Sequence, residues 1–155
     1  MIHTHNQISI DAPADAVFEL AADIDRWPEF LAHYRYVREV PSSGKTRQVA
    51  MGAKRSGIPV RWEATQVTYP EERRIVYHHV AGVTQEMDVE WRIDPRQESC
   101  QVSISHDLRS RRWWLRNPIA EWIVGNLFVM HIADRTLMGI KRHAEERAGA
   151  PELSR

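Results

Sequence analysis

Residues 11–40 read DAPADAVFELAADIDRWPEFLAHYRYVREV, and this stretch decides the fold. Pro13, with the side-chain acceptor of Asp11 before it, predicts the start of a helix, because proline in a first turn loses no hydrogen bond. Apolar residues then recur at helical spacing and form one stripe: Val17, Leu20, Ala21 and Ile24. Pro28 predicts a second helix, whose stripe is aromatic: Trp27, Phe30, Leu31 and Tyr34. Two short helices are therefore expected, and the aromatic face either fills the core or lines a cavity.

Much of the remaining chain before residue 110 alternates between apolar and polar residues, which is the period of a β-strand. The alternation predicts seven strands, at residues 5–10, 36–40, 46–54, 58–68, 74–80, 84–94 and 98–108. Short turns rich in Gly, Pro and Asp separate the last six of them, for example at residues 41–44. Turns of this length join antiparallel strands, so an antiparallel meander is expected.

The pattern changes to a helical period after residue 117. Asn117 supplies a capping side chain and Pro118 a first-turn proline, which together predict a helix start. One long helix is expected over residues 118–148, with an apolar stripe of Ile119, Ile123, Leu127, Met130, Leu137 and Ile140. Its first half is apolar around most of its circumference, which predicts that it is covered on several sides.

An alternating sheet has one apolar face to cover, and only the long helix is large enough to cover it. We therefore expect an α+β helix-grip fold, in which a seven-stranded curved antiparallel sheet wraps around a long C-terminal helix. Two short helices lie between the first and second strands of this fold. Residues 1–148 are expected to form a single ligand-binding domain with an internal cavity, and residues 149–155 a frayed tail.

The composition excludes several classes of function. The 155 residues carry 21 basic and 21 acidic side chains, so bulk attraction to nucleic acid is not indicated and no DNA partner is expected. Cys100 is the single cysteine, which excludes an internal disulfide and favours a reducing compartment. No secretory signal is recognisable at the N-terminus, and a cytoplasmic location is expected. No zinc-binding motif occurs, and neither a metal nor a cofactor is expected.

The motif IDAPADAVF at residues 10–18, the motif DIDRWPEF at residues 23–30 and the closing helix resemble the START-like (SRPBCC, Bet v 1-like) superfamily. The resemblance covers residues 5–147. Two branches are the most similar: the bacterial polyketide cyclase/dehydrase or aromatase group, and the coenzyme Q-binding, Coq10-like group. The resemblance is specific for the fold, whereas the same fold serves cyclases, lipid carriers and hormone receptors.

In the aromatases the cavity is lined by a Trp before the proline of the second helix, a Tyr one or two turns later, and a Trp on the fourth strand. Trp27 matches the first of these, Tyr34 or Tyr36 the second, and Trp62 the third. The strand Arg of the aromatases is not carried over, because Ala64 and Gln66 follow Trp62 at its spacing. This departure favours an apolar ligand that is bound rather than converted.

A cyclase of this kind must hold a folded poly-β-ketone and move protons. The predicted catalytic residues are Tyr34, His79 and His106, because imidazoles titrate near neutral pH and the phenol can donate a proton. The predicted ligand-binding residues are Trp27, Phe30, Tyr36, Trp62, Gln66, Tyr77, Gln85, Met87 and Met130. For each histidine, the alternative is a buried or edge residue without a chemical role.

The segment Arg109–Arg116, RSRRWWLR, concentrates four Arg and two Trp before the long helix. Arg and Trp together suit a membrane interface, and the same charges suit an acidic acyl carrier protein. Two alternatives are left open: an RNA-binding segment that uses stacking and phosphate contacts, and a gate loop with solvated arginines. A homodimer is also left open.

The sequence leaves three functions open and favours the first. The favoured function is a polyketide cyclase/aromatase-like enzyme that cyclises and dehydrates a hydrophobic polyketide in its cavity. The second is a non-catalytic carrier of a quinone, isoprenoid or other lipid. The third is a ribosome-interacting protein of the RatA-like kind, against which the balanced charge argues.

Overall fold

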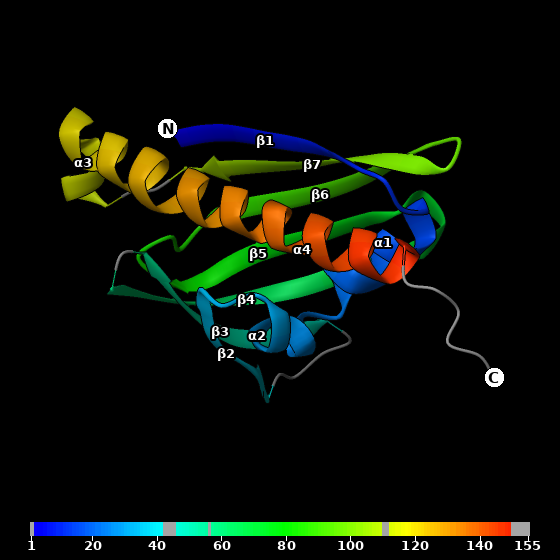
Figure 1. Cartoon of the computed structure of the whole chain (residues 1–155). Coiled ribbons are helices and arrows are strands. Elements are labelled where there is room, and N and C mark those ends of the chain that lie inside the picture. Colours follow the sequence, from blue (N-terminus) through cyan, green and yellow to red (C-terminus); the bar gives the residue numbers. More distant parts are fainter. Residues whose placement is uncertain (1, 42–45, 56, 110–111, 150–155) are drawn as a thin grey trace.

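The computed structural model describes residues 2–41, 46–55, 57–109 and 112–149, without the side chains of residues 127 and 128. It contains one seven-stranded antiparallel sheet in the order β1-β7-β6-β5-β4-β3-β2 (Figure 1). Consecutive strands from β2 to β7 are neighbours in the sheet. β1 pairs with β7, so β1 and β2 are the two edge strands. The strands are β1 (Ile2–Ile10), β2 (Tyr34–Val40), β3 (Arg47–Arg55), β4 (Ile58–Tyr69), β5 (Arg74–Gly82), β6 (Met87–Arg96) and β7 (Ser99–Leu108).

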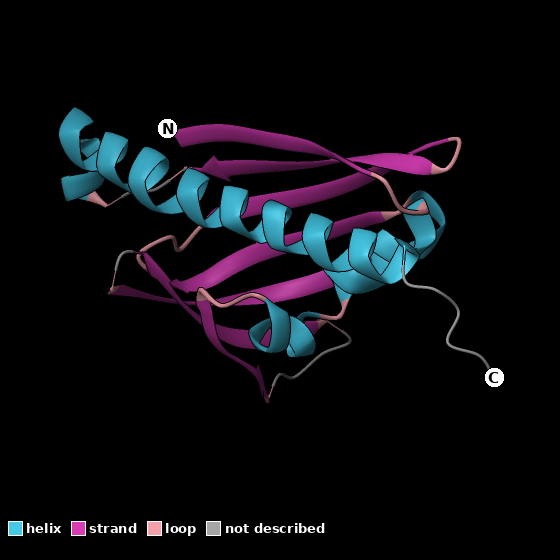
Figure 2. Ribbon diagram, in the orientation of Figure 1, coloured by secondary structure: helices cyan, strands magenta, loops and turns pink. Residues whose placement is uncertain are grey.

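One continuous helical run crosses the curved face of the sheet (Figure 2). It consists of α3 (Pro118–Trp122), the π-helical segment η4 (Ile123–Met130) and α4 (His131–Gly149). Between β1 and β2 lie α1 (Ala14–Ala22), the 3₁₀ turn η1 (Ile24–Arg26) and α2 (Trp27–Phe30). Two further 3₁₀ turns are η2 (Pro70–Glu72) and η3 (Trp113–Arg116). The predicted helix-grip fold is therefore confirmed.

The long helix is tied to both edges of the sheet. At the β1 edge, Asn6 donates to Asp134 over 2.6 Å, and Lys141 donates to the Ser9 carbonyl over 2.8 Å. At the opposite edge, a nitrogen of His33, just before β2, lies 3.0 Å from the Thr136 hydroxyl. Because the two edges contact the same helix, the sheet curves around it and the two surfaces enclose space near the middle strands.

Some local predictions were wrong. Asp11 does not cap the first helix: its backbone N–H donates to Glu145, and Pro13 is the N-cap without a side-chain bond. The second helix is one turn long, and Tyr34 begins β2, where it pairs with Ala53. The aromatic spacing that predicted a longer helix is produced by a turn followed by a strand.

The first part of the long helix also differs from its prediction. Asn117 caps it as expected, by accepting from the Ile119 N–H over 2.8 Å. Ile119 and Trp122 are exposed, so this part is not covered on several sides. The side chain of Leu127, residues 42–44 of the predicted turn and residues 150–155 of the predicted tail lie outside the described residues.

Gly82 allows the end of β5 to approach β4 closely. Its φ is +101°, and a Cβ there would lie 2.5 Å from the Arg61 carbonyl oxygen and 2.9 Å from the Trp62 Cα. Both atoms belong to the backbone of β4, so neither moves at low cost. We expect Gly82→Ala to lower the free energy of unfolding by about 3 kcal/mol, as strain and overpacking combine.

Gly57→Ala is the matched control for this prediction. Gly57 also has a positive φ, of +83°, but nothing lies within 4 Å of its Cβ position. We expect it to lose only about 1 kcal/mol from backbone strain. Urea unfolding measures both variants, and an equal loss in the two would contradict the close approach at Gly82.

Candidate functional site

A cavity of about 80 Å³ lies between the middle strands and the long helix. None of its seventeen described lining residues is Asp, Glu, Lys or Arg, so the cavity surface is apolar with a few neutral polar groups. Typical ligand pockets measure about 300–1,000 Å³, so a polycyclic ligand requires side chains to move. The lining residues are Trp27, Tyr34, Met51, Val60, Trp62, Tyr77, His79, Thr84, Met87, Val89, Trp91, Ile104, His106, Val129, Ile132, Ala133 and Thr136.

Aromatic rings form a continuous wall along one side of the cavity. The Trp27 ring contacts Tyr34 edge-on with centroids 5.1 Å apart, and Tyr34 contacts Trp62 in the same way at 6.1 Å. Trp62 stacks on His79 with an interplanar angle of 6°. Trp27 is fixed by its indole N–H, which donates to the Leu20 carbonyl over 3.1 Å. Such a wall presents flat apolar faces to a ligand and holds His79 in one orientation.

His79 and His106 are two buried imidazoles on this cavity. Burial, and next the nearby His106, lower the pKa of His79 to about 3, while burial lowers the pKa of His106 to about 4. Both rings are therefore neutral at pH 7, whereas their prediction as catalytic residues rested on titration near neutral pH. Each has one ring nitrogen with a free lone pair, and burial makes that nitrogen a weaker base than it is in water. Nδ1 of His79 lies 2.7 Å from the Thr84 hydroxyl. Nδ1 of His106 is buried without a hydrogen-bond partner in the described part of the chain, which leaves it available to a ligand.

Tyr34 and Thr136 form a second polar group at the helix side of the cavity. Thr136 donates its only hydroxyl hydrogen to the Ile132 carbonyl over 2.7 Å. The Tyr34 oxygen lies 3.4 Å from the Thr136 oxygen, so the phenol is the donor of that pair. Burial raises the pKa of Tyr34 to about 12, so the phenol stays protonated at neutral pH. Its hydrogen is directed at Thr136 rather than at a ligand.

The Tyr77 oxygen accepts a hydrogen bond from Gln66, whereas the Tyr34 phenol donates one. The Gln66 amide nitrogen donates to the Ala22 carbonyl over 3.0 Å and to the Tyr77 oxygen over 3.1 Å. The nitrogen and the oxygen of the Gln66 amide cannot be exchanged. The Ala22 carbonyl can only accept a hydrogen bond, so it needs the amide nitrogen, and the Arg47 guanidinium on the other side can only donate, so it needs the amide oxygen. Since the Tyr77 oxygen accepts, its own hydrogen is left for another acceptor. Burial raises the pKa of Tyr77 above its usual range, so that hydrogen stays in place at neutral pH.

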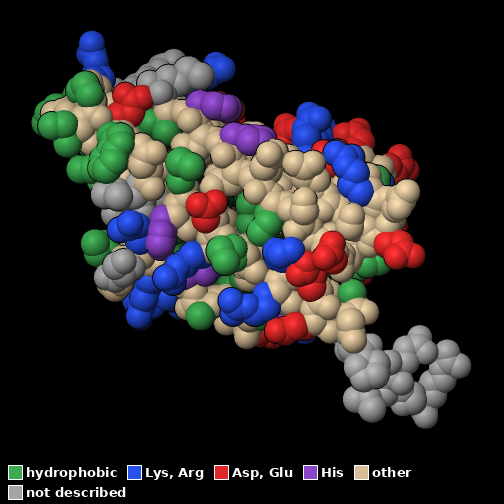
Figure 3. All heavy atoms as spheres, turned by 45° about the horizontal axis from the view of Figure 1, so that its top comes forward, with side chains coloured by type: hydrophobic (Ala, Val, Ile, Leu, Met, Phe, Trp, Pro, Cys, Tyr) green, Lys and Arg blue, Asp and Glu red, His purple; other side chains and the backbone are tan. Residues whose placement is uncertain are grey.

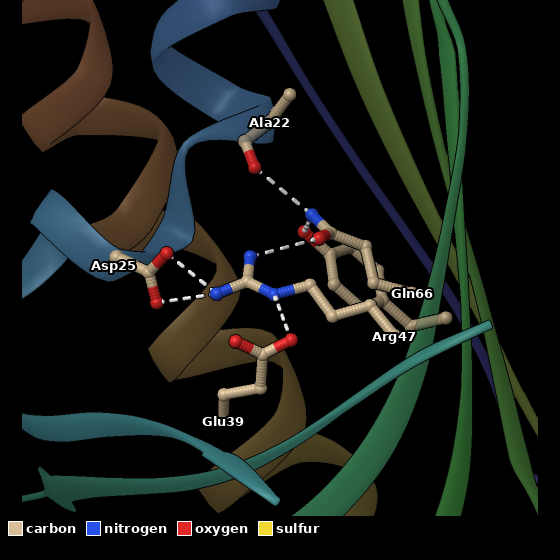
Figure 4. A network of polar contacts seen from close by, with 6 residues as sticks. Ala22, Asp25, Glu39, Arg47 and Gln66 are labelled. Atoms are coloured by element: carbon tan, nitrogen blue, oxygen red, sulfur yellow. Dashed lines mark hydrogen bonds and ion pairs between the residues drawn. The ribbon is translucent and has the colours of Figure 1, made fainter. Parts of the chain in front are cut away.

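The guanidinium that orients Gln66 belongs to Arg47, the residue paired with it across β3 and β4 (Figure 4). Arg47 donates to the Gln66 oxygen over 3.4 Å and forms a close ion pair with Asp25, 2.5 Å away. A longer contact of 3.7 Å joins it to Glu39. The network therefore links the turn after α1, the sheet and the cavity wall.

The structure brings seven predicted residues to the cavity: Trp27, Tyr34, Trp62, Tyr77, His79, Met87 and His106. Gln66 contacts the cavity only through Tyr77. Phe30 does not reach it, because it stacks on His143 with ring centroids 4.3 Å apart. A β-bulge between Tyr34 and Tyr36 turns Tyr36 to the other face, where its ring covers Gly52.

Two more predicted ligand-binding residues lie away from the cavity. Gln85 was expected to lie within a strand at residues 84–94, but β6 begins at Met87, and Gln85 lies exposed in the preceding turn. Met130 ends the π-helical segment, where the wider turn shifts the helical phase, so Val129 and Ile132 line the cavity instead.

Sequence reasoning missed Thr84 and Thr136. Thr84 was expected to begin the strand at residues 84–94, whereas it lies buried in the turn before β6. Thr136 is the single polar residue among the buried positions of α4, which are Ile132, Ala133, Thr136, Leu137, Ile140 and Ala144. A polar residue between buried apolar positions of a helix was a usable signal, because a buried hydroxyl has a hydrogen-bond partner in most structures.

A second hollow of about 920 Å³ lies between α1 and the end of α4. Four carboxylates line it, namely Asp11, Glu19, Asp23 and Glu98, together with Arg26 and Arg147. All six side chains are exposed, so this hollow is a solvated surface groove. We place the candidate site in the smaller, apolar cavity, where buried polar groups converge.

A curved sheet gripping a long helix around an apolar cavity defines the START-like, helix-grip class of proteins. The sequence profile of the family described as polyketide cyclase / dehydrase and lipid transport matches residues 10–130, and the chain belongs to that family. A bifunctional cyclase/dehydratase of the granaticin polyketide synthase from Streptomyces violaceoruber is 26% identical over 74 residues. The match covers 48% of this chain and 23% of that relative, so the chain spans about a quarter of its length.

Solved structures agree on the fold. The Zhui aromatase/cyclase from Streptomyces sp. R1128 superposes with a TM-score of 0.79 at 20% identity, covering 96% of each chain. The di-domain aromatase/cyclase BexL from the BE-7585A biosynthetic pathway has a TM-score of 0.74 at 27% identity. In that comparison 99% of this chain covers 49% of BexL.

Proposed function

We propose that the chain binds a hydrophobic polyketide in the cavity and promotes its cyclisation and dehydration. The observation that carries the proposal is the set of polar groups on the cavity: two neutral imidazoles, of which His106 has an unpartnered Nδ1 in the described chain, and one phenol whose oxygen accepts from Gln66 and whose hydrogen is left for a ligand. These are the two groups that an intramolecular aldol reaction needs. Membership of the cyclase family and the similarity to aromatase/cyclases support the same reaction.

The reaction needs only proton transfers once the chain is folded. A neutral imidazole, His106 or His79, removes a proton from a methylene between two carbonyls, and the carbanion attacks a carbonyl carbon further along the chain. Tyr77 donates its hydrogen bond, and then its proton, to the carbonyl oxygen as the new C–C bond forms. The imidazolium then returns its proton to the phenolate, which restores both groups. For the dehydration, the imidazole removes the remaining proton of the same carbon while Tyr77 protonates the departing hydroxyl, so that water leaves and a C=C bond forms in the closed ring. A second proton transfer from the imidazolium to the phenolate restores the site.

The cavity must enlarge to hold such a substrate. Met51 and Met87 line it with flexible side chains, and Trp62 is only partly buried. Movement of these three residues widens the cavity without displacing the long helix. The aromatic wall then stacks on the growing ring system, which stabilises the folded substrate in a near-attack geometry.

A non-catalytic lipid carrier is the second candidate. The seventeen described lining residues include no formally charged side chain, which suits a quinone, an isoprenoid or a fatty acyl chain. A carrier needs no oriented phenol, so the Arg47–Gln66–Tyr77 network favours the enzyme over the carrier. Function on a ribosome and a cytoplasmic location stay predictions from the sequence.

The decisive experiment adds the protein to a minimal polyketide synthase and compares the products with and without it. A new cyclised and dehydrated aromatic product supports the proposal. Native mass spectrometry of the freshly purified protein is run in parallel. An unchanged product profile overturns the enzyme, and a retained quinone or isoprenoid in that case establishes the carrier.

A further inference from the structure

Four exposed apolar side chains gather at one end of the molecule. Trp113 of η3 is 82% exposed, and on the next helix Ile119, Trp122 and Ile123 are 69%, 58% and 37% exposed. We call these four residues the α3 tip. Figure 3 shows hydrophobic side chains over the end of the molecule where α3 lies. The other large apolar side chains exposed in the described chain are scattered: Ile58, Tyr69 and Met138.

The α3 tip is held in place rather than frayed. Leu115, two residues after Trp113, is buried and anchors η3 to the core. Arg112 donates to Gln85 over 3.0 Å, which ties η3 to the turn between β5 and β6. Ile119, Trp122 and Ile123 follow helical spacing, so they share one face of the helix. A fixed apolar face exposed to water costs free energy unless something covers it.

Two exposed basic side chains lie near Trp113 in the chain, and α3 carries one acidic side chain, Glu121. Arg109 and Arg116 are exposed, and they flank Trp113 along the chain. Indole rings prefer the headgroup depth of a bilayer, aliphatic side chains enter the adjoining acyl region, and guanidinium groups pair with lipid phosphates. We propose that the α3 tip docks onto the surface of an anionic lipid membrane.

A second copy of the chain fits the α3 tip less well. Stable protein interfaces use about 20–30 residues a side, whereas the tip presents four apolar residues beside two arginines. Shallow insertion of one or two indoles is sufficient for reversible membrane binding when basic side chains assist. The size and the charge of the patch therefore favour a lipid surface.

The helix lies on the membrane in this proposal and does not cross it. Residues Pro118–Gly149 are long and apolar enough to span a bilayer by length and composition. However, Ile132, Leu137 and Ile140 are buried against the sheet and stay there in the folded protein. The docked end is close to the cavity, because the same helix continues to Val129 in its lining. Docking therefore brings the cavity near the lipid. Docking is expected equally of an enzyme that cyclises its ligand and of a carrier that only binds it.

Vesicle flotation tests the proposal with the full chain. We expect binding to phosphatidylcholine vesicles that contain phosphatidylglycerol, and binding at least about tenfold weaker to phosphatidylcholine alone. The Trp113→Ala/Trp122→Ala double variant is expected to lose about tenfold or more of the binding. Arg116→Gln is expected to weaken binding to the anionic vesicles selectively.

Met138→Ala is the matched control, since it removes an apolar side chain that is 58% exposed further along the same helix. It is expected to float like the unmodified protein. Absence of flotation, or equal flotation of the double variant, overturns the proposal. Two further measurements test the competing partners: sedimentation equilibrium detects a dimer, and a pull-down with acyl carrier protein detects a carrier complex. If the unmodified protein forms either complex, the double variant does not, and neither protein binds vesicles, the proposal is also overturned.

Discussion

Tyr77→Phe is expected to lower kcat for cyclisation about a hundredfold while KM changes by about twofold or less. The reason is the direction of one hydrogen bond. Gln66 donates to the Tyr77 oxygen over 3.1 Å, so the phenol hydrogen is free to stabilise the negative charge that develops on the attacked carbonyl. The ring, which contacts the substrate in the ground state, remains in the variant. Steady-state kinetics with a soluble polyketide analogue separates the two constants.

Gln66→Glu tests the direction of the bond rather than the presence of the phenol. A carboxylate accepts from Arg47 and also accepts from Tyr77, so it turns the phenol hydrogen away from the cavity. We expect a loss of kcat close to that of Tyr77→Phe and no further loss in the double variant. Tyr69→Phe, which removes an exposed hydroxyl outside the cavity, is expected to leave the kinetics unchanged. Independent, additive losses for Tyr77 and Gln66 would show that Gln66 does not act through the phenol.

Lowering the pH from 7 to 5 is expected to reduce the free energy of unfolding by roughly 3–6 kcal/mol. In the folded protein, burial lowers the pKa of His79 to about 3 and the pKa of His106 to about 4. Burial, followed by the charge of Arg135, also lowers the pKa of His33 to about 4. In the unfolded chain these imidazoles titrate near pH 6.5. Between about pH 6.5 and pH 4 the unfolded state therefore binds more protons, and stability falls as the pH falls.

Urea unfolding at a series of pH values measures this effect. His79→Gln, which keeps a polar side chain beside Thr84, removes one of the three titrations and is expected to flatten the curve over this window. A curve for His79→Gln parallel to that of the unmodified protein would mean that His79 does not stay neutral in the fold. The same experiment bears on catalysis, because the proposed base acts only in its neutral form.

The sequence contained most of the fold. Period-two alternation identified the six strands from β2 to β7 and the strand β1, because inward and outward side chains must alternate on a sheet with one buried face. Asn117 and Pro118 marked the start of the long helix through their own backbone chemistry. Alternate positions of the strand expected at residues 46–54 lie on one face of β3, and three of them are buried: Val49, Met51 and Ala53.

Local irregularities limited the prediction of the site. The bulge at Tyr34 reversed the parity that would have placed Tyr36 in the cavity, and the π-helical segment shifted the face on which Met130 lies. A β-bulge and a π-helical turn each insert one extra residue into the regular period of a strand or helix. Tertiary packing stabilises them, whereas the local sequence preference does not reveal them. The late start of β6 moved Gln85 into a turn for the same reason.

By itself, the sequence determined the order of elements and the apolar face of each, because these depend on residue spacing along a single strand or helix. Only the tertiary structure decided the chemistry of the cavity. Arg47, Gln66 and Tyr77 come from three adjacent strands. The Ala22 carbonyl and the Arg47 guanidinium contact the Gln66 amide from opposite sides, and these two contacts decide that Gln66 donates to the Tyr77 oxygen. The same holds for part of the α3 tip: Ile119 and Ile123 belong to the apolar stripe that was expected to be covered, and the structure leaves both exposed.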